Sequence, residues 1–168
     1  MNITLRHEEA CDAAAIAKVT AAAFLHATHT NHEEQFIAAA LRKAGKLAIS
    51  IVAEHGGAVV GHVAVSPVTI SDGSARWYGL GPVAVAPDWQ GRGIGSRLVE
   101  QALCALQQTG AAGCVLVGDP DYYDRFGFTR AAGLLIPDVA PEYVLSLVFS
   151  DKKPAGTVAF HESFYGPD

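Results

Sequence analysis

The sequence contains few cysteines, few charged residues and no long apolar run, and each shortage excludes a class of protein. Its three cysteines, Cys11, Cys104 and Cys114, have neither the spacing of a metal site nor the even number of a disulfide framework. We expect idle thiols in a reducing, cytoplasmic setting. No apolar run approaches the ~18 residues of a membrane span. Residues 1–9 carry charges without a hydrophobic signal core, so we expect no membrane association.

Basic residues are also scarce, because 12 Lys and Arg stand against 17 Asp and Glu, for a net charge of −5. The phosphate backbone of nucleic acid repels an acidic chain unless its basic residues cluster, and here they are scattered. We therefore expect no nucleic-acid partner. Half of the residues are apolar and 17% are charged, which is typical of a folded chain. We expect residues 1–168 to form a single domain.

The most informative stretch is a strand-like run, Gly81–Val85, followed by Pro87 and three alternating glycines, Gly91, Gly93 and Gly95. An apolar-periodic segment, 94–106, comes next and predicts a helix. The first N–H groups of a helix lack partners and its dipole is positive there, so this end binds anions. The stretch predicts a phosphate or pyrophosphate site; the alternative is a glycine-softened helix start without a ligand.

Gln90-Gly91-Arg92-Gly93-Ile94-Gly95 lacks the spacing of a Rossmann fingerprint and the Gly-Lys-Ser/Thr of a Walker loop. It resembles the Q/R-x-x-G-x-G/A signature of the GNAT N-acetyltransferase superfamily, which binds the pyrophosphate of coenzyme A. In that superfamily a helical tyrosine precedes a Gly-Phe pair by four residues, as Tyr123 precedes Gly127. The run from Val117 to Phe128 further resembles the YhbS-like branch of predicted acetyltransferases.

The rest of the chain predicts a mixed α/β fold. The segments 3–6, 47–54, 58–67 and 76–86 read as strands, with a tight hairpin at His55-Gly56-Gly57 and a turn at 71–74. A helix over 91–109 crossing to a strand at 113–117 implies parallel pairing. A short helix over 121–126, a loop over 131–141 and strands near 128, 143–149 and 157–160 complete the sheet. The resemblance implies a largely antiparallel sheet of six to seven strands, about four helices, and splayed strands that form an acyl-CoA cleft.

Two further helices are expected before residue 46. Asp12 is predicted to cap the first, and the second, over 33–43, is predicted to bury Phe36, Ile37, Ala40 and Leu41 before Gly45 ends it. Between them lie three histidines, at positions 26, 29 and 32. Their spacing does not favour a metal site, so we expect loop residues and no bound metal. The resemblance implies that this loop borders the acceptor pocket.

The resemblance also implies how acetyl-CoA is held. Main-chain N–H groups of Gln90–Ser96 would bind the pyrophosphate, with Arg92 or Arg97 adding charge. A strand irregularity, expected at Gly81-Pro82, would let pantetheine pair with Val83 and Val85 like an added strand, and a backbone N–H near Val83 would polarise the thioester carbonyl. The expected cofactor-binding residues are Val83, Ala84, Val85, Gln90, Gly91, Arg92, Gly93, Ile94, Gly95, Ser96, Tyr123, Arg125 and Phe126.

For proton transfer, Tyr123 is the candidate acid for the departing thiolate, because a phenol is protonated at neutral pH. The alternative is a packing role, and Tyr122 is the second choice because its position points elsewhere on the helix. Arg125 could reach the cofactor, although we favour an ion pair with one of three nearby aspartates. The asparagine that the family commonly carries before this helix is replaced by Gly118-Asp119-Pro120. A general base is not evident; the candidates are Glu54, His62 and Asp119.

The resulting hypothesis is an N-acetyltransferase that transfers an acetyl group from acetyl-CoA to a primary amine of a small molecule or peptide, by direct attack in a ternary complex. The alternatives are a non-catalytic module or sensor that binds coenzyme A or acyl-CoA, and a nucleotide-binding domain, for which the required acid and first-strand glycines are missing. The acidic composition favours a cationic acceptor such as a polyamine, aminoglycoside or basic peptide. The resemblance implies that a homodimer would form through residues 143–164.

Overall fold

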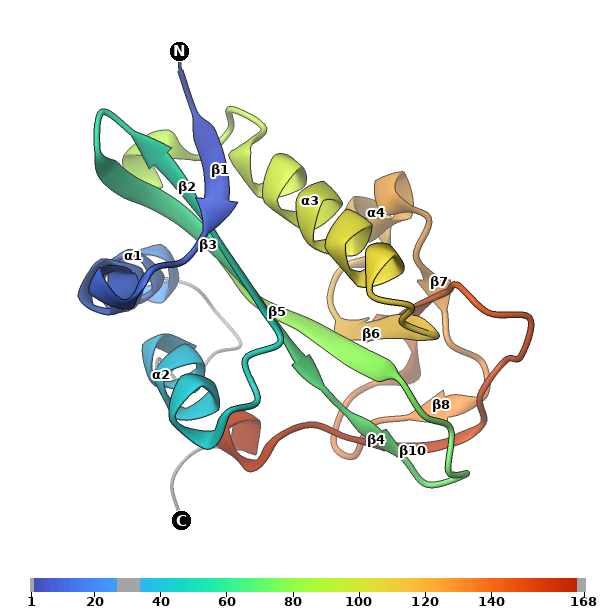
Figure 1. The fold of residues 1–168 in the computed structure, drawn as a ribbon. Helices are drawn as coiled ribbons and strands as arrows, with labels where there is room; N and C mark the ends of the chain where they lie inside the picture. The colour runs from blue at the N-terminus through green and yellow to red at the C-terminus, as the bar shows by residue number, and fades with distance from the viewer. Residues whose placement is uncertain (1, 27–33, 166–168) are drawn as a thin grey trace.

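In the computed structural model, which describes residues 2–26 and 34–165, ten strands form two sheets (Figure 1). The main sheet has seven strands in the order β1-β2-β3-β5-β6-β9-β7. Only β5 and β6 pair in parallel among these described strands. The expected largely antiparallel sheet is confirmed. The strands are β1 Thr4–His7, β2 Ile49–His55, β3 Ala58–Pro67, β5 Trp77–Val85, β6 Gly113–Val117, β7 Thr129–Arg130 and β9 Val144–Val148.

Helices cover both faces of this sheet. In Figure 1, α1 and α2 lie on one side of it, and α3 and α4 lie on the other. The four helices in the described part of the chain are α1 Ala13–Phe24, α2 Glu34–Ala44, α3 Ile94–Gln108 and α4 Pro120–Tyr123. Short 3-10 turns connect several elements: η1 Ala10–Asp12, η2 Pro87–Trp89, η3 Asp124–Phe126, η4 Pro141–Tyr143 and η5 Glu162–Tyr165.

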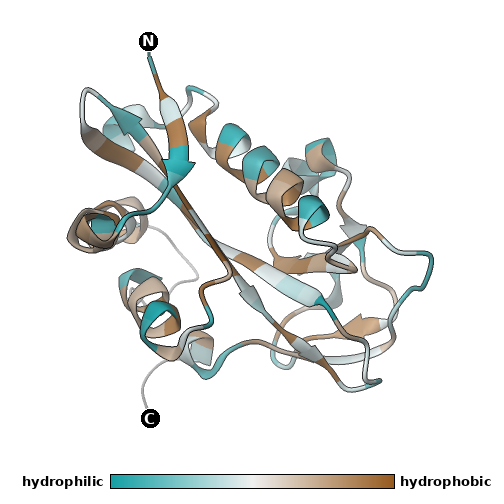
Figure 2. Cartoon of the chain, viewed as in Figure 1, coloured by the Kyte–Doolittle hydropathy of each residue, from teal (hydrophilic) through white to brown (hydrophobic). Residues whose placement is uncertain are grey.

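The apolar stripe of α3 packs on the main sheet. Figure 2 shows apolar and polar residues alternating along this helix. Burying a large apolar side chain contributes roughly 1.5–3 kcal/mol, so the stripe fixes the helix on the sheet. The helix begins at Ile94, later than the predicted start at Gly91, because Gly91 and Gly93 have φ values of +76° and +79° that a right-handed helix cannot contain. The buried residues are Ile94, Leu98, Val99, Ala102, Leu103 and Leu106.

The hairpin between β2 and β3 is confirmed. Gly56 and Gly57 have φ values of +56° and +82°, which match the two positive-φ positions of a type I′ turn. His55 pairs with Ala58 across the turn, so the two-residue loop sets the register of both strands.

A bulge interrupts β5 where the sequence predicted an irregularity. Val83 pairs with Val63 and Leu80 pairs with Val65, so Gly81 and Pro82 face the single residue Ala64. Gly81 has a φ of +132°, and the Gly81–Pro82 peptide bond is cis. Pairing of β5 with β6 is confined to 77–79 against 113–115, so β5 continues past the bulge without β6 beside it. The expected splayed strands are confirmed.

The last strand was assigned to the wrong sheet. Instead of extending the main sheet, β10 (Gly156–Ala159) pairs with β4 (Thr69–Ile70) and β8 (Leu134–Leu135) in a three-stranded sheet. The predicted loop over 131–141 therefore contains β8. The physical reason is a second apolar cluster, because Val158 and Leu134 are buried with Trp77 on the main sheet.

Two predictions for the first helices were also wrong. The carboxylate of Asp12 does not cap α1; it accepts hydrogen bonds from Arg6 at 2.7 and 3.0 Å and from the Glu9 N–H. Two hydrogen bonds from one guanidinium hold the carboxylate in this orientation, away from the first N–H groups of α1. Phe36 is 63% exposed, because the inward face of α2 is centred on Ile37, Ala38 and Leu41. The predicted loop histidines at 29 and 32, and the predicted helix start at 33, lie outside the described residues.

Candidate active site

No side chain caps the N-terminus of α3. Its N-cap is Gly93, which has no side chain to offer, and the first turn contains no acidic residue. The Arg97 N–H donates to the Gly93 carbonyl at 3.1 Å. The N–H groups of Ile94, Gly95 and Ser96 precede this bond and have no acceptor within the helix. This end of α3 therefore carries the partial positive charge that attracts an anion.

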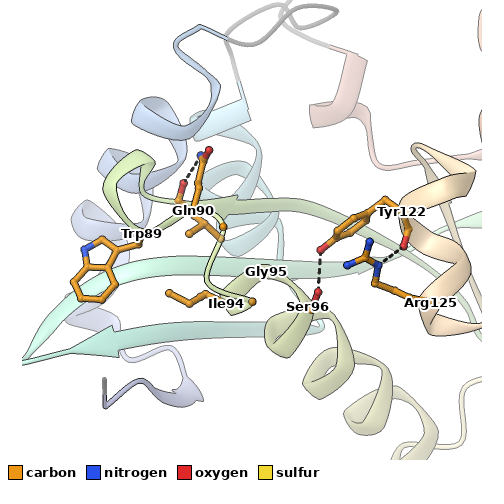
Figure 3. A pocket seen from close by; sticks show the side chains of 10 residues that line it. Trp89, Gln90, Ile94, Gly95, Ser96, Tyr122 and Arg125 are labelled. Atoms are coloured by element: carbon orange, nitrogen blue, oxygen red, sulfur yellow. Dashed lines mark hydrogen bonds between the residues drawn. The ribbon is translucent and has the colours of Figure 1, made fainter.

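A cavity of about 390 Å³ lies in front of this helix end (Figure 3). Three segments form its wall: the end of β5, the loop with the first turn of α3, and α4 with the following 3-10 turn. The lining includes eight of the predicted cofactor-binding residues, whose role in binding stays a prediction: Val85, Gln90, Gly91, Gly93, Ile94, Gly95, Ser96 and Arg125. Trp89 and Tyr122, which were not predicted to bind, also line it.

The side chain of Gln90 shapes the loop. Its Nε2 donates to the Val85 carbonyl at 3.0 Å and so ties the loop to the end of β5 (Figure 3). At Gly95, a Cβ would lie 3.5 Å from the Tyr122 hydroxyl oxygen and 3.7 Å from a Val85 methyl carbon. The cavity is therefore narrow beside Gly95, and a longer side chain there would enter it.

Tyr122 and Arg125 form the opposite wall. The hydroxyl of Tyr122 lies 3.3 Å from the Ser96 hydroxyl, and Arg125 Nε donates to the Tyr122 carbonyl at 2.8 Å (Figure 3). The Arg125 guanidinium also lies over the Tyr122 ring, 4.3 Å from its centroid. No ion pair among the described residues involves Arg125, so the favoured ion pair with an aspartate was wrong. Its charge instead faces the cavity.

The main chain after the bulge presents its polar groups away from β3. The Ala86 N–H donates to the Val60 carbonyl, and Ala84 lies opposite His62 in the same register. Hydrogen-bonded and non-bonded pairs alternate along an antiparallel ladder. The N–H and C=O groups of the intervening residues, Val83 and Val85, therefore point to the side from which β6 has diverged. The Val85 carbonyl accepts the hydrogen bond from Gln90, whereas the N–H and C=O groups of Val83 are oriented like those of a residue in an edge strand.

Tyr123 lies beside the end of β6 and does not line the cavity in front of α3. Its ring packs against Phe128 and covers Gly118, where a Cβ would lie 2.5 Å from the ring. Burial raises the pKa of Tyr123 to about 12, with smaller contributions from Tyr122 and Cys114. The phenol is therefore protonated at neutral pH. Phe126, another predicted binding residue, packs against Tyr123 with ring centroids 5.9 Å apart.

The remaining predicted residues have structural contacts. Ala84 is 1% exposed, so only its main chain could meet a ligand. The guanidinium of Arg92 lies 4.9 Å from the centroid of the Trp89 ring. Arg97 donates to the Ile3 carbonyl at 3.2 Å, which turns it toward the segment before β1 and away from the cavity. Of Arg92 and Arg97, the two arginines expected to add charge at the pyrophosphate site, Arg97 therefore points away from that site.

The three candidate bases also have other partners. His62 is 1% exposed, and its Nε2 lies 2.7 Å from the Ser50 hydroxyl, which in turn bonds Glu8. Burial lowers the pKa of His62 to about 4, although the carboxylate of Glu8 opposes this shift. Glu54 pairs with Arg6 at 3.1 Å. Asp119 caps α4 by accepting from the Asp121 N–H. None of the three lines the cavity in front of α3.

Residues 2–26 and 34–165 contain neither a membrane-spanning helix nor a metal-binding cluster. No helix in these ranges is long and apolar enough to cross a membrane. No group of three or more His, Cys, Asp or Glu side chains in them is placed to hold a metal ion.

An uncapped helix end, a glycine loop and a splayed strand pair thus meet at one place. Residues 46–130, which contain all three, match the family model of the acetyltransferase (GNAT) domain. The chain belongs to the GNAT acetyltransferase family. The same fold occurs in a GNAT family acetyltransferase from Brucella melitensis, crystallised in complex with acetyl-CoA. That protein is 45% identical, with a TM-score of 0.87 over 97% of this chain and 98% of its own.

A second GNAT structure, YhbS from Escherichia coli in complex with CoA, is 30% identical with a TM-score of 0.87 over 98% of this chain and 93% of its own. In sequence, the chain is 41% identical over 93 residues to the uncharacterized N-acetyltransferase YhbS of Escherichia coli strain K12. That match spans 55% of this chain and 56% of YhbS. The resemblance to the YhbS-like branch is confirmed.

Proposed function

We propose that this protein transfers an acetyl group from acetyl-CoA to a primary amine of a small molecule or peptide, by direct attack within a ternary complex. The observation that carries the proposal is the uncapped N-terminus of α3, which opens into a cavity between β5 and α4. Two structural relatives crystallised with acetyl-CoA or CoA support it. Acetyl-CoA supplies an acetyl group on a thioester, and the chain must bind it, orient it and handle the protons.

The pyrophosphate would be held by main-chain N–H groups from Gly91 to Ser96. These groups fit an anion, because they precede the first helical hydrogen bond and no side chain caps the helix. Arg125 would add a full positive charge from the facing wall, where Tyr122 fixes its orientation. The site therefore combines a helix dipole with one oriented guanidinium.

The pantetheine arm would pair with β5 after the bulge. Val83 presents its N–H and C=O groups, and Val85 its N–H, to the side that β6 has left, which is where an extended ligand adds to a sheet edge. The Val83 N–H would then donate to the thioester carbonyl. A preorganised donor of this kind typically contributes about 3–4 kcal/mol to transition-state stabilisation.

Tyr123 would protonate the departing thiolate. The hydroxyl is protonated over the whole physiological range, so it can donate a proton to the sulfur as the carbon–sulfur bond breaks, while the attacking amine gives up its own proton to solvent. Direct attack by the amine is supported because no cysteine among the described residues lines the cavity in front of α3, and the serine that does, Ser96, has the Tyr122 hydroxyl beside it and no base to activate it. A covalent acyl-enzyme would need an activated nucleophile.

Thiol release from acetyl-CoA, followed with a thiol reagent while an amine is varied, tests the proposal. We expect release that depends on the amine, with intersecting initial-velocity lines that indicate a ternary complex. Parallel lines would indicate an acyl-enzyme and contradict direct attack. Saturable acetyl-CoA binding with no release for any amine would indicate a non-catalytic binding module.

A further inference from the structure

A second cavity lies on the other side of the β5 bulge. It has a volume of about 570 Å³ and shares no lining residue with the cavity in front of α3. Leu80, Gly81 and Pro82 of the bulge form part of its wall, as does Val117 at the end of β6. Because the bulge is where the proposed function places the thioester carbonyl, this cavity has the position that an acceptor amine needs.

The wall of this cavity is mainly apolar and aromatic. Four aromatic side chains line it, from α1, the end of β10 and η5: Phe24, Phe160, Phe164 and Tyr165. Its lining contains two carboxylates, Glu34 and Asp138, and no Lys, Arg or His among the described residues. A wall of this kind favours an apolar ligand body and a positive charge, and it disfavours a negative one.

Glu34 has the more informative geometry. It lies in the first turn of α2, and its Oε2 is shielded from solvent without a hydrogen-bond partner in the described part of the chain. The carboxylate lines the cavity, so a rotation of this side chain would bring the shielded oxygen to an ammonium group there, and the pairing would offset the cost of leaving the oxygen unpartnered. The aromatic walls would meanwhile cover the apolar part of the same ligand and can attract its cation through their ring faces.

We infer that the acceptor is a primary monoamine on an apolar or aromatic body, and that Glu34 selects it by binding the ammonium group, which releases one proton to water before the neutral nitrogen attacks the thioester. This inference rests on the proposed function, which places the thioester carbonyl at the β5 bulge. It narrows the acceptor class, since a polyamine or an aminoglycoside would place further cations or hydroxyls against the apolar and aromatic side chains that form most of the wall and cannot hydrogen-bond them. A free amino acid would bring its carboxylate toward Glu34 and Asp138.

Direct binding of three probes tests the inference without acetyl-CoA. In calorimetric or saturation-transfer NMR titrations we expect 2-phenylethylamine to bind at least tenfold more tightly than phenylalanine, which adds a carboxylate, and than spermidine, which adds two cations. Glu34→Gln keeps the size of the side chain, and we expect it to weaken 2-phenylethylamine about tenfold. Glu142→Gln, an exposed residue on η4 outside the cavity, is the matched control and should leave binding unchanged.

A second readout does not depend on the stability of the variant. The ratio of phenylalanine to 2-phenylethylamine affinity, measured on one preparation, should shift toward phenylalanine in Glu34→Gln. An unchanged ratio, or tighter binding of phenylalanine or spermidine to the wild type, overturns the inference.

The two proposals fail separately. Acetyl transfer to spermidine but not to 2-phenylethylamine would overturn this inference and leave the proposed function intact. Binding of 2-phenylethylamine that depends on Glu34, in a protein that releases no thiol from acetyl-CoA, would support this pocket and overturn the proposed function.

Discussion

The hydroxyl of Tyr122 lies 3.3 Å from the hydroxyl of Ser96, and this contact joins α4 to the first turn of α3 across the proposed pyrophosphate cavity. The adjacent residue, Tyr123, turns its ring toward Gly118 and Phe128 instead. Two neighbouring tyrosines therefore face different parts of the site. We propose that Tyr122 supports cofactor binding and that Tyr123 transfers a proton, and a pair of phenylalanine variants separates these roles.

Tyr122→Phe should weaken acetyl-CoA binding three- to tenfold and leave kcat unchanged. The variant removes one hydrogen bond, which typically contributes about 0.5–1.5 kcal/mol, and keeps the ring on which Arg125 stacks. Calorimetric titration gives the Kd and thiol release gives kcat. A Kd equal to that of the wild type would show that the contact with Ser96 does not support binding.

Tyr123→Phe should show the opposite pattern, with kcat lowered about a hundredfold or more and acetyl-CoA affinity retained. Loss of a general acid typically costs a factor of about 10²–10⁴. The phenylalanine ring preserves the packing against Gly118, so the fold should survive. A kcat within threefold of the wild type would assign Tyr123 a packing role only.

His62 should make the protein less stable as the pH falls from 7 to 5. In the unfolded chain a histidine takes up a proton near its ordinary pKa of about 6.5, whereas burial holds the pKa of His62 at about 4 in the folded protein. Between these values the unfolded state binds more protons, so acidification favours unfolding. The expected loss is about 2 kcal/mol from pH 7 to pH 5.

Urea unfolding at both pH values measures this loss. His62→Gln should remove most of the pH dependence, and His7→Gln, at an exposed position, should retain it. In the folded protein, Glu8 and Asp12 stay ionised between pH 7 and pH 5, because Arg42 and Arg6 hold the pKa values of these two carboxylates below their ordinary range. An equal pH dependence in His62→Gln and the wild type would contradict the assignment.

The sequence predicted those parts of the fold that depend on local chemistry. Gly56 and Gly57 specify a turn that needs two positive φ values, and Gly81-Pro82 cannot continue a regular ladder. The alternating glycines before α3 predict an open helix end for the same reason. These features follow from one or two residues and need no knowledge of what packs around them.

Other features depend on partners far away in the chain. The Arg125 side chain could reach three neighbouring aspartates, yet it stacks on Tyr122, and no local pattern distinguishes these outcomes. The apolar character of β10 predicts a strand without saying which sheet it joins, and Trp77 with Val158 decides that. The unpartnered oxygen of Glu34 becomes visible only when α2 is placed beside the bulge.

The measurement that tests the central claim most directly is calorimetric titration of Gly95→Glu with acetyl-CoA, with ATP and NAD as controls on the wild type. Gly95 is helical and has room for a Cβ, and an acidic residue in a first helical turn stabilises the fold through the dipole. The same charge would occupy the place proposed for the pyrophosphate.

We predict selective, saturable binding of acetyl-CoA to the wild type. Gly95→Glu should lose affinity at least a hundredfold, about 2.7 kcal/mol, and the neutral Gly95→Gln should lose less. Thermal melting should show both variants folded. Acetyl-CoA binding to Gly95→Glu as tight as to the wild type would contradict the placement of the pyrophosphate at the N-terminus of α3.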